Sequence, residues 1–214
     1  MNIIDIFCGQ KSIGNVFKEH EHSVLTVDWD AQHNPDICAN ILDLTADDLF
    51  GFYGWDHVDY LHMSPDCTTY SIAAVSHHRN KDLSPKSDNA KLADDVRKHI
   101  LQLLDDLEPT YFTIENPRGL MRKMPDMQAL ARKYFFTTVT YCQYGDTRMK
   151  PTDIWHNIPM QFRQMCKNGD KCHESAPRGS RTGTQGLSGS VDRSKIPHEL
   201  CYDIYNNVVR CLND

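Results

Sequence analysis

The sequence lacks the features that mark several common classes of protein. No apolar run approaches the ~20 residues of a membrane-spanning helix, and residues 1–5 do not open a signal peptide. The net charge is −6, so the positive excess typical of a nucleic-acid-binding chain is absent overall. There is also no internal repeat. We therefore expect a cytoplasmic protein with no membrane partner and no obligate protein partner.

The composition that remains is that of a globular protein with a substantial core. Hydrophobic residues make up 40% of the 214-residue chain and charged residues 24%, which fits one large domain with or without a small appendage. Eight cysteines are spread along the chain rather than concentrated in a small scaffold. Because no export signal is predicted, we expect them to be reduced thiols.

Charge is distributed unevenly along the chain. Residues 1–140 contain 13 Lys and Arg against 21 Asp and Glu. Residues 141–200 contain 9 Lys and Arg against 6 Asp and Glu. A polyanionic partner is therefore expected to contact the second of these segments, where the positive excess lies.

Three predicted strand ends near the start of the chain carry groups suited to a nucleotide-like ligand. Residues 2–7 form an apolar strand that leads into a tight turn around Gly9 and then a helix, although the full G-x-G-x-x-G pattern is absent. The second predicted strand ends in Asp28 and Trp29, and an acidic turn follows at Asp43. An acid about 20 residues beyond a glycine turn is where doubly wound folds bind ribose hydroxyls. Each feature alone could be a surface turn, but together they predict a cofactor site in an α/β fold.

Two later strand ends carry reactive side chains. One predicted strand is followed by Pro65 and Cys67, and a strand at residues 110–114 ends in Glu115. A free cysteine is most often a small buried hydrophobe, but the end of a strand is where α/β proteins place their chemistry. A carboxylate directly before a Pro/Gly turn needs a basic partner or a ligand. Between the two lies a polar loop, residues 67–86, which we expect to act as a mobile lid, and then a long amphipathic helix.

The last third of the chain changes in character. Residues 135–142 predict a strand, and residues 153–155 predict a further strand at the edge of the sheet. Residues 160–196 contain a basic stretch rich in Gly, Ser and Thr, which predicts an extended loop. A helix that opens at Pro197 closes the chain.

A cluster of metal-ligand types lies in this loop. Cys166, Cys172 and His173 could begin a zinc site, but their spacing is wider than the common C-x2–4-C. A fourth ligand would have to be Cys201 or His198. We predict no metal site from this pattern.

The order of these motifs resembles that of the DNA cytosine-C5 methyltransferases, in a short form of the kind encoded by bacteriophages. Residues 5–9, DIFCG, resemble the family's first motif, D-L-F-x-G-x-G. Residues 65–71, PDCTTYS, resemble P-C-Q-x-F-S, which carries the nucleophile, and residues 115–117, ENP, resemble E-N-V. Gln143 and Arg148 resemble the Q-x-R-x-R motif.

This resemblance covers residues 3–158 and implies the fold and cofactor of the family. The fold would be α/β with a doubly wound, mostly parallel sheet, the Rossmann-like fold of class I S-adenosylmethionine-dependent methyltransferases. Residues 1–158 would form the catalytic domain, residues 159–196 a small basic DNA-recognition insert, and residues 197–214 a closing helix. The resemblance implies that S-adenosylmethionine is bound by Phe7, Gly9, Lys11, Ser12, Ile13, Asp28, Trp29, Asp43 and Pro65.

The resemblance also implies a covalent mechanism on a cytosine flipped out of DNA, within a bacterial cell or a phage-infected host. The thiolate of Cys67 would add to C6 of the base while Glu115 protonates N3, so that C5 takes the methyl group. Asn116 would fix the loop, and Arg148 would meet O2 of the base. Such enzymes serve restriction–modification or phage DNA modification. Further DNA contacts are expected from Arg79, Lys81, Arg178 and Arg181.

Departures from the family pattern leave alternatives open. Asp66 precedes Cys67 where the family has proline, Lys11 replaces the second glycine of the first motif, and a separate target-recognition domain is nearly absent. Arg148 is offset by one position. Lys11 would suit a carboxylated S-adenosylmethionine, and the negative charge would suit a free nucleotide as substrate. A catalytically inactive DNA-binding homologue is the third alternative, which the intact Cys67 and Glu115 disfavour.

Overall fold

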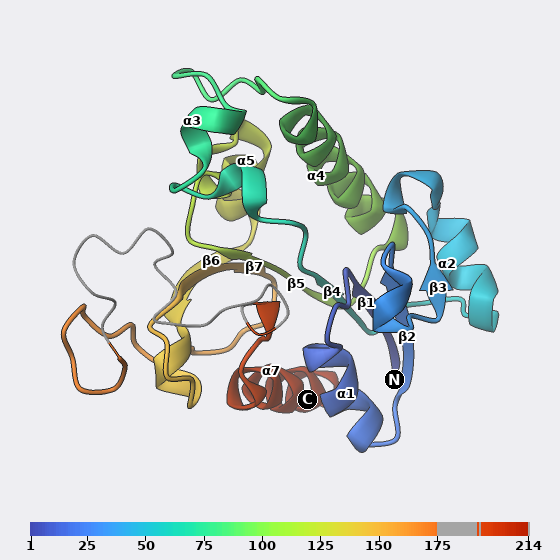
Figure 1. Ribbon diagram of the computed structural model, residues 1–214. Coiled ribbons are helices and arrows are strands. Elements are labelled where there is room, and N and C mark those ends of the chain that lie inside the picture. The colour runs from blue at the N-terminus through green and yellow to red at the C-terminus, as the bar shows by residue number, and fades with distance from the viewer. Residues whose placement is uncertain (175–191, 193, 214) are drawn as a thin grey trace.

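A computed structural model of the protein describes residues 1–174, 192 and 194–213. It contains a seven-stranded sheet with helices on both faces (Figure 1). The strand order is β3-β2-β1-β4-β5-β7-β6. The strands are β1 (Asn2–Ile6), β2 (Ser23–Asp28), β3 (Ile37–Cys38), β4 (Tyr60–Met63), β5 (Tyr111–Pro117), β6 (Phe135–Thr140) and β7 (Pro151–His156).

Helices α1 and α7 cover one face of the sheet, and α4 and α5 cover the other (Figure 1). None of the helices in the described part of the chain is long and apolar enough to cross a membrane. The α-helices are α1 (Ser12–Glu19), α2 (Ala46–Tyr53), α3 (Val75–His78), α4 (Asp88–Leu107), α5 (Pro125–Lys133) and α7 (His198–Asn213). Short 3-10 turns are η1 (Ala31–His33), η2 (Ile41–Asp43), η3 (Thr68–Tyr70), η4 (Met121–Lys123) and η5 (Tyr141–Tyr144).

The first five strands run parallel, so their carboxyl ends meet at one edge of the sheet. The strand order turns back between β1 and β4, because β2 and β3 lie on one side of β1 while β5 lies beyond β4. In open α/β sheets, ligands bind in the crevice at this reversal of direction. The predicted doubly wound, mostly parallel sheet is confirmed.

Strand β7 corrects one prediction. A strand near residues 153–155 was expected at the sheet edge, but β7 lies between β5 and β6 and pairs antiparallel with both. All of its residues after Pro151 are buried, which an interior position requires. The edge strand is β6, whose first residues, Phe135 and Phe136, are exposed.

Helix α4 follows the predicted amphipathic pattern. Ser87 caps its first turn by accepting a hydrogen bond from the backbone N–H of Ala90 at 3.2 Å. Its buried stripe, which includes Ile100 and Leu103, packs on the sheet. Leu92 belongs to the predicted stripe but is 52% exposed, because at this end the helix faces an open cavity rather than the core.

Candidate active site

A cavity of about 450 Å³ opens at the reversal of strand order. One wall comes from the ends of β1, β2 and β4, and the facing wall comes from α4 through Leu92 and Val96. Four of the nine predicted cofactor residues line this cavity: Phe7, Asp28, Trp29 and Pro65. The structure therefore brings together side chains from three strand ends that lie far apart in the sequence.

Asp28 is one of two acidic residues that line the cavity, with Asp66, and backbone donors fix its orientation. One carboxylate oxygen accepts from the N–H of Gly9 at 2.9 Å, and the other accepts from the N–H of Asp30 at 3.0 Å. Gly9 adopts a left-handed conformation with φ +45°, which brings its N–H to the acid without strain. Trp29, next in the chain, is 72% exposed, so its indole is open to a ligand.

Three other predicted cofactor residues do not line the cavity. The ammonium group of Lys11 donates to the carbonyl oxygen of Asn34 at 2.5 Å. Ser12 begins α1, and its hydroxyl accepts from the backbone N–H of Ile196 at 3.3 Å. Ile13 lies on the buried face of α1, in the hydrophobic core. These residues shape the turn and the helix that follow β1.

The acidic turn predicted at Asp43 also differs in detail from the expectation. Asp43 is exposed at the end of η2 and does not line the cavity. Asn40 and Ile41, at the start of the same turn, do line it. The turn that the sequence pattern marked therefore borders the cavity through Asn40 and Ile41, and not through Asp43.

Cys67 follows β4, and its sequence neighbours Asp66 and Thr68 both line the cavity. Thr68 donates to the Asp66 carboxylate through its backbone N–H at 3.1 Å and its hydroxyl at 2.8 Å, which fixes the turn before η3. Burial raises the pKa of the Cys67 thiol to about 11. The negative charges of Asp66 and Glu115 add to this shift, and the positive charge of Lys150 opposes it.

Glu115 lies near the end of β5, beside β4, and is buried. Burial raises the pKa of its carboxyl group, whereas the charge of Lys150 and a 2.8 Å hydrogen bond from the Tyr141 hydroxyl oppose the rise. Asn116 donates to the Pro65 carbonyl at 2.9 Å and so ties the cysteine loop to β5. The side-chain oxygen of Asn116 is buried with no hydrogen-bond partner among the described residues.

Lys150 is the residue of this site that the sequence analysis missed. Burial lowers the pKa of its ammonium group, and the charges of Glu115 and Cys67 act against that shift. Its Nζ lies 4.5 Å from the centre of the Tyr141 ring. Its place directly before β7 gave no local signal in the sequence, because its effect depends on Cys67 and Glu115, which are distant along the chain.

Arg148 was predicted to contact the base. The structure buries its guanidinium against Asp146, with Nε 2.9 Å from Oδ1. Arg148 lines a second hollow of about 800 Å³, together with Ser12 and residues from the start of α7. Lys150, not Arg148, is the cation whose charge acts on the pKa of Cys67.

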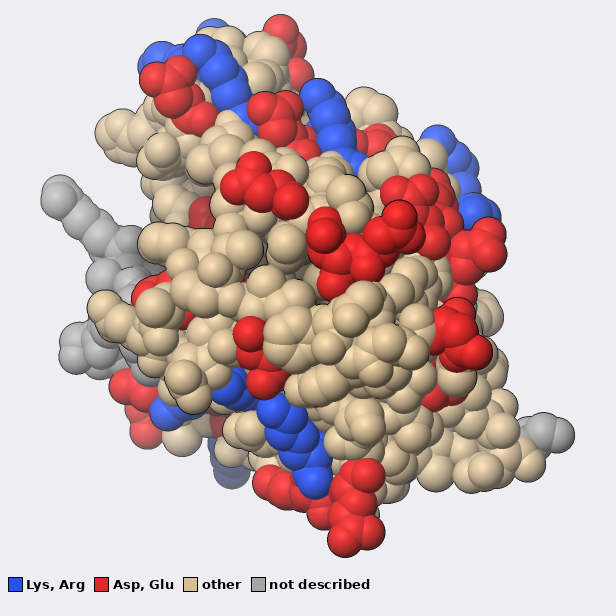
Figure 2. All heavy atoms as spheres, turned by 90° about the vertical axis from the view of Figure 1, so that its right-hand side faces the viewer, with Lys and Arg blue, Asp and Glu red and all other residues tan. Residues whose placement is uncertain are grey.

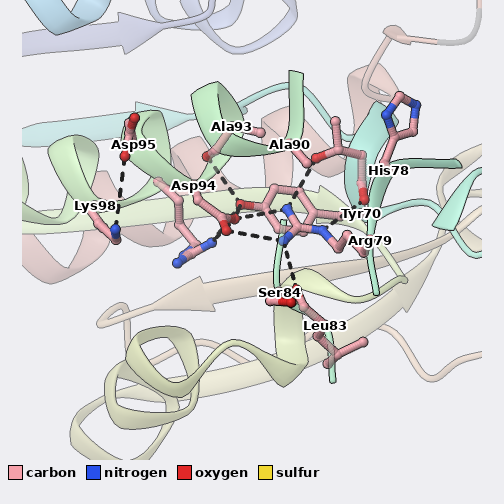
Figure 3. A network of polar contacts seen from close by, with 12 residues as sticks. Tyr70, His78, Arg79, Leu83, Ser84, Ala90, Ala93, Asp94, Asp95 and Lys98 are labelled. Carbon is pink, nitrogen blue, oxygen red and sulfur yellow. Dashed lines mark hydrogen bonds and ion pairs between the residues drawn. The ribbon is translucent and has the colours of Figure 1, made fainter. Parts of the chain in front are cut away.

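Arg79 lies inside the protein, which corrects the prediction that it contacts DNA. It is only 3% exposed, and its guanidinium donates to Asp94 at 2.8 Å and to the carbonyl oxygen of Thr69 at 3.1 Å. Figure 3 shows Arg79 stacked beside Tyr70, whose ring centre lies 4.3 Å away, with both side chains directed at Asp94 on α4. A guanidinium with these buried partners is not available to phosphate.

The same hydrogen bonds and ion pairs correct the expectation for residues 67–86. This segment was expected to be a mobile lid, but it contains η3 and α3 and is anchored on α4 through Tyr70 and Arg79 (Figure 3). Lys81 and Lys86 remain exposed on it. The two other predicted DNA contacts, Arg178 and Arg181, lie outside the described residues.

No protein-family model matches this sequence, and no curated protein matches it. Solved structures do match its fold. A candidate DNA modification methyltransferase encoded within an Escherichia coli prophage has a TM-score of 0.54 at 18% identity, over 73% of this chain and 46% of that one. The Entamoeba histolytica methyltransferase EhMeth has a TM-score of 0.52 at 14% identity, over 78% and 57%. A mutant of Spodoptera frugiperda DNMT2 has a TM-score of 0.50 at 17% identity, over 76% and 52%.

These comparisons concern architecture alone, because the identities are low. The chain spans about half the length of the proteins it matches. The cavity found above lies at the reversal of strand order, the usual ligand site of such sheets. The chain therefore has the Rossmann-like fold of these methyltransferases.

Proposed function

We propose that this protein methylates carbon 5 of cytosine in DNA, with S-adenosylmethionine as methyl donor, Cys67 as nucleophile and Glu115 as proton donor. The observation that carries this proposal is the position of the partly buried Cys67 thiol and the buried Glu115 carboxyl group at neighbouring strand ends beside an open cavity, where the charge of Glu115 acts on the pKa of Cys67. Such a pair suits covalent addition coupled to proton transfer. The fold shared with methyltransferases supports the same conclusion.

The residues that line the cavity have the polar and apolar groups that S-adenosylmethionine requires. Asp28 would accept hydrogen bonds from ribose hydroxyls, and the exposed Trp29 would lie against the adenine ring. Phe7 and Ile41 supply apolar surface. Its volume of about 450 Å³ is within the range of small-molecule sites, about 300–1,000 Å³. When bound there, S-adenosylmethionine supplies an electrophilic methyl group.

Cys67 and Glu115 would each contribute one step that makes C5 of the base nucleophilic. Because the pKa of Cys67 is about 11, the group is a thiol at neutral pH and must lose its proton as the bond from sulfur to C6 forms. Glu115, whose pKa is raised, is a source of the proton that N3 then takes up. Together these steps leave C5 electron-rich. After C5 has taken up the methyl group, the C5 proton passes to solvent, as the Cys67 thiol proton did at the start. The bond from C6 to sulfur then breaks, Cys67 leaves as the thiolate, and N3 returns its proton to Glu115.

Lys150 would stabilise both negative charges that develop in this sequence. Its charge lowers the pKa of Cys67 and of Glu115, so it favours the thiolate of one and the carboxylate of the other. The thiolate appears as the bond to C6 forms and again as it breaks, and the Glu115 carboxylate persists while the base is covalently attached. A partly buried cation that already acts on both groups is an electrostatic contribution to catalysis that needs no reorganisation.

DNA would approach away from the acidic face of the molecule. Figure 2 shows the side that carries α2 and β3, where red acidic groups outnumber blue basic ones. The local positive excess belongs to residues 141–200. We propose that residues 159–196 serve as the recognition insert of a catalytic domain formed by residues 1–158, with residues 197–214 closing it, and that Lys81, Arg178 and Arg181 contact phosphates.

The proposal is tested by analysing nucleosides after incubation of DNA with the protein and S-adenosylmethionine carrying a deuterated methyl group. We expect 5-methyldeoxycytidine that carries the label, detected by mass spectrometry. Label on an exocyclic amino group, on adenine or only on free nucleotides would contradict the proposal. A mass increase larger than a labelled methyl group, after supply of a carboxylated donor, would favour the carboxylated alternative.

A further inference from the structure

Three cysteines and one histidine from three separate segments meet at one point beside the sheet edge. Cys142 lies in η5 directly after β6, Cys166 lies in the chain that follows β7, and Cys172 and His173 follow a short turn. One candidate ligand atom from each residue lies within 4.8 Å of the others. In Figure 1 the orange segment that carries the last three residues lies against the yellow turn of η5.

We propose that Cys142, Cys166, Cys172 and His173 form a structural zinc site. Three thiolates and one imidazole are a Cys₃His set, one of the standard ligand sets of structural zinc. Soft sulfur donors in a tetrahedral arrangement select zinc over harder cations. Because four protein ligands fill a tetrahedral site, no open position remains for substrate, and the metal would act on structure and not on chemistry.

The distances between the donors agree with a tetrahedron around one ion. Zn–S bonds of about 2.3 Å and Zn–N bonds of about 2.0–2.1 Å place two sulfurs about 3.8 Å apart and a sulfur and a nitrogen about 3.5 Å apart. The observed Cys172–Cys142 sulfur distance is 3.7 Å, and His173 Nδ1 lies 3.6 Å from the Cys166 sulfur and 3.5 Å from the Cys172 sulfur. The Cys142–Cys166 pair, at 3.1 Å, would open by less than ~1 Å.

A simpler explanation, that these are ordinary buried cysteines or a disulfide, fits the surroundings less well. Cys172 is exposed, so burial of a small hydrophobe does not explain its position. The three cysteines and the histidine direct their ligand atoms at one another. The shortest sulfur–sulfur distance, 3.1 Å between Cys142 and Cys166, is well beyond the ~2.05 Å of a disulfide bond. The cluster therefore has the donors and the shape of a metal site.

The segment that carries Cys166, Cys172 and His173 has no secondary structure of its own in its described part. Between the end of β7 and residue 174 the chain forms no helix or strand. Its attachments include hydrogen bonds from the Cys166 N–H to the Thr140 hydroxyl at 3.1 Å and from the Arg163 N–H to the Tyr144 hydroxyl at 2.9 Å. Segments without their own secondary structure or core are those in which a bound metal contributes most to folding.

This zinc site would also stabilise the turn whose Tyr141 hydroxyl is hydrogen-bonded to Glu115. Cys142 directly follows Tyr141, whose hydroxyl donates to Glu115. Zinc bound at Cys142 would therefore tie the chain after β7 to the turn that supports Glu115. The sequence pointed to Cys201 or His198 as a fourth ligand, but Cys201 is buried in the core and His198 lies on the surface near Glu19. The missing ligand was Cys142, which lies 24 residues before Cys166.

The test measures metal in the purified full-length protein, produced without a metal-affinity tag. Elemental analysis is expected to find about one zinc per chain, and cobalt(II) added to metal-free protein should give the visible bands of a tetrahedral site with thiolate-to-metal charge transfer. Cys172→Ser should lose most of the zinc. Cys38→Ser, which changes another exposed cysteine outside the cluster, should keep it.

Three results would overturn the proposal. The first is wild-type protein that binds neither zinc nor cobalt while its thiols are reduced. The second is a protein mass lower by two hydrogens, with peptide mapping that locates a disulfide between Cys142 and Cys166. The third is unchanged zinc content in Cys172→Ser. The cobalt titration uses wild-type protein, so it stays decisive if a variant fails to fold. The proposal does not depend on methyl transfer, because the metal can be counted whether or not the protein modifies DNA.

Discussion

The two ends of the sheet hold their functional side chains by different means. On the β1–β2–β3 side, the Asp28 carboxylate is oriented by backbone N–H groups, including that of Gly9, from the turns at the strand ends. On the β5–β7–β6 side, Glu115 is held by the hydroxyl of Tyr141 and acted on by the charge of Lys150, both of which arrive from other elements. The first arrangement depends on turn geometry and the second on long-range packing of side chains.

This difference predicts different consequences of mutation. A change on the β1–β2–β3 side should alter ligand affinity and leave the chemistry in place. A change on the β5–β7–β6 side should alter the protonation and reactivity of its neighbours, because buried charges interact strongly there. The following experiments test this contrast, from the largest expected effect to the smallest.

Replacing the proposed nucleophile should separate chemistry from binding most clearly. Cys67→Ser is expected to lower the rate of methyl transfer by at least about a thousandfold, because a serine hydroxyl is far less ionised than a thiol. Calorimetry should find S-adenosylmethionine affinity close to that of the wild type, and Cys38→Ser should leave both properties unchanged. A Cys67→Ser rate within tenfold of the wild type would show that the reaction does not pass through this thiol.

Replacing Glu115, the proposed proton donor, should have the next largest effect. Glu115→Gln keeps the size of the side chain and an acceptor for Tyr141, so the fold should be retained. The rate is expected to fall by about 10²–10⁴, the usual contribution of a general acid. Glu199→Gln, at an exposed carboxylate on α7, is the matched control. Equal rates in the two variants would make Glu115 a structural residue.

The cofactor side is tested by comparing two aspartates. Asp28→Asn should weaken S-adenosylmethionine binding by about 10–100-fold, since hydrogen bonds to a charged group contribute about 1.5–3 kcal/mol. At saturating cofactor the rate should recover towards the wild-type value. Asp43→Asn should change affinity little, because Asp43 is exposed and does not line the cavity. Isothermal titration calorimetry measures both, and a larger loss for Asp43→Asn would reverse the assignment.

The smallest effect concerns the pH dependence of the thiol. Because the folded pKa of Cys67 is raised to about 11, its alkylation by iodoacetamide should accelerate as pH rises from 7 towards 11. Lys150→Met removes a charge that lowers this pKa, so alkylation at a given pH should slow by about tenfold for each unit of further rise. Lys98→Met, at an exposed lysine, is the control. Peptide mapping isolates the Cys67 signal, and a plateau below pH 9 would contradict the expected pKa.

Much of the fold could be predicted because its signals are local. The strand, glycine turn and helix from β1 to α1, and the apolar stripe of α4, depend on spacing within a few residues. The place of β7 could not be predicted, because antiparallel insertion between β5 and β6 depends on pairing between distant segments. The sequence analysis expected this strand at the sheet edge, whereas its burial on both faces requires an interior position.

The residues of the candidate site also divide into those with a local sequence signal and those that depend on distant contacts. Asp28, Trp29 and Pro65 could be found because a strand end followed by a turn marks the rim of an α/β sheet. Arg79 was assigned to DNA because it lies in a polar stretch, but its partner Asp94 lies 15 residues away on α4. Lys150 shows the same limit, since only the folded chain reveals that its charge acts on Cys67 and Glu115.

The central claim is that Cys67 forms a covalent bond with C6 of a cytosine. It is tested most directly with duplex DNA containing 5-fluorocytosine, whose C5 fluorine cannot leave as a proton does, so that the adduct persists after methyl transfer. We expect a denaturation-resistant complex that requires S-adenosylmethionine, with peptide mapping placing the DNA on Cys67, and none with Cys67→Ser. Methylated cytosine formed without any trapped complex, or a complex that persists in Cys67→Ser, would contradict the account.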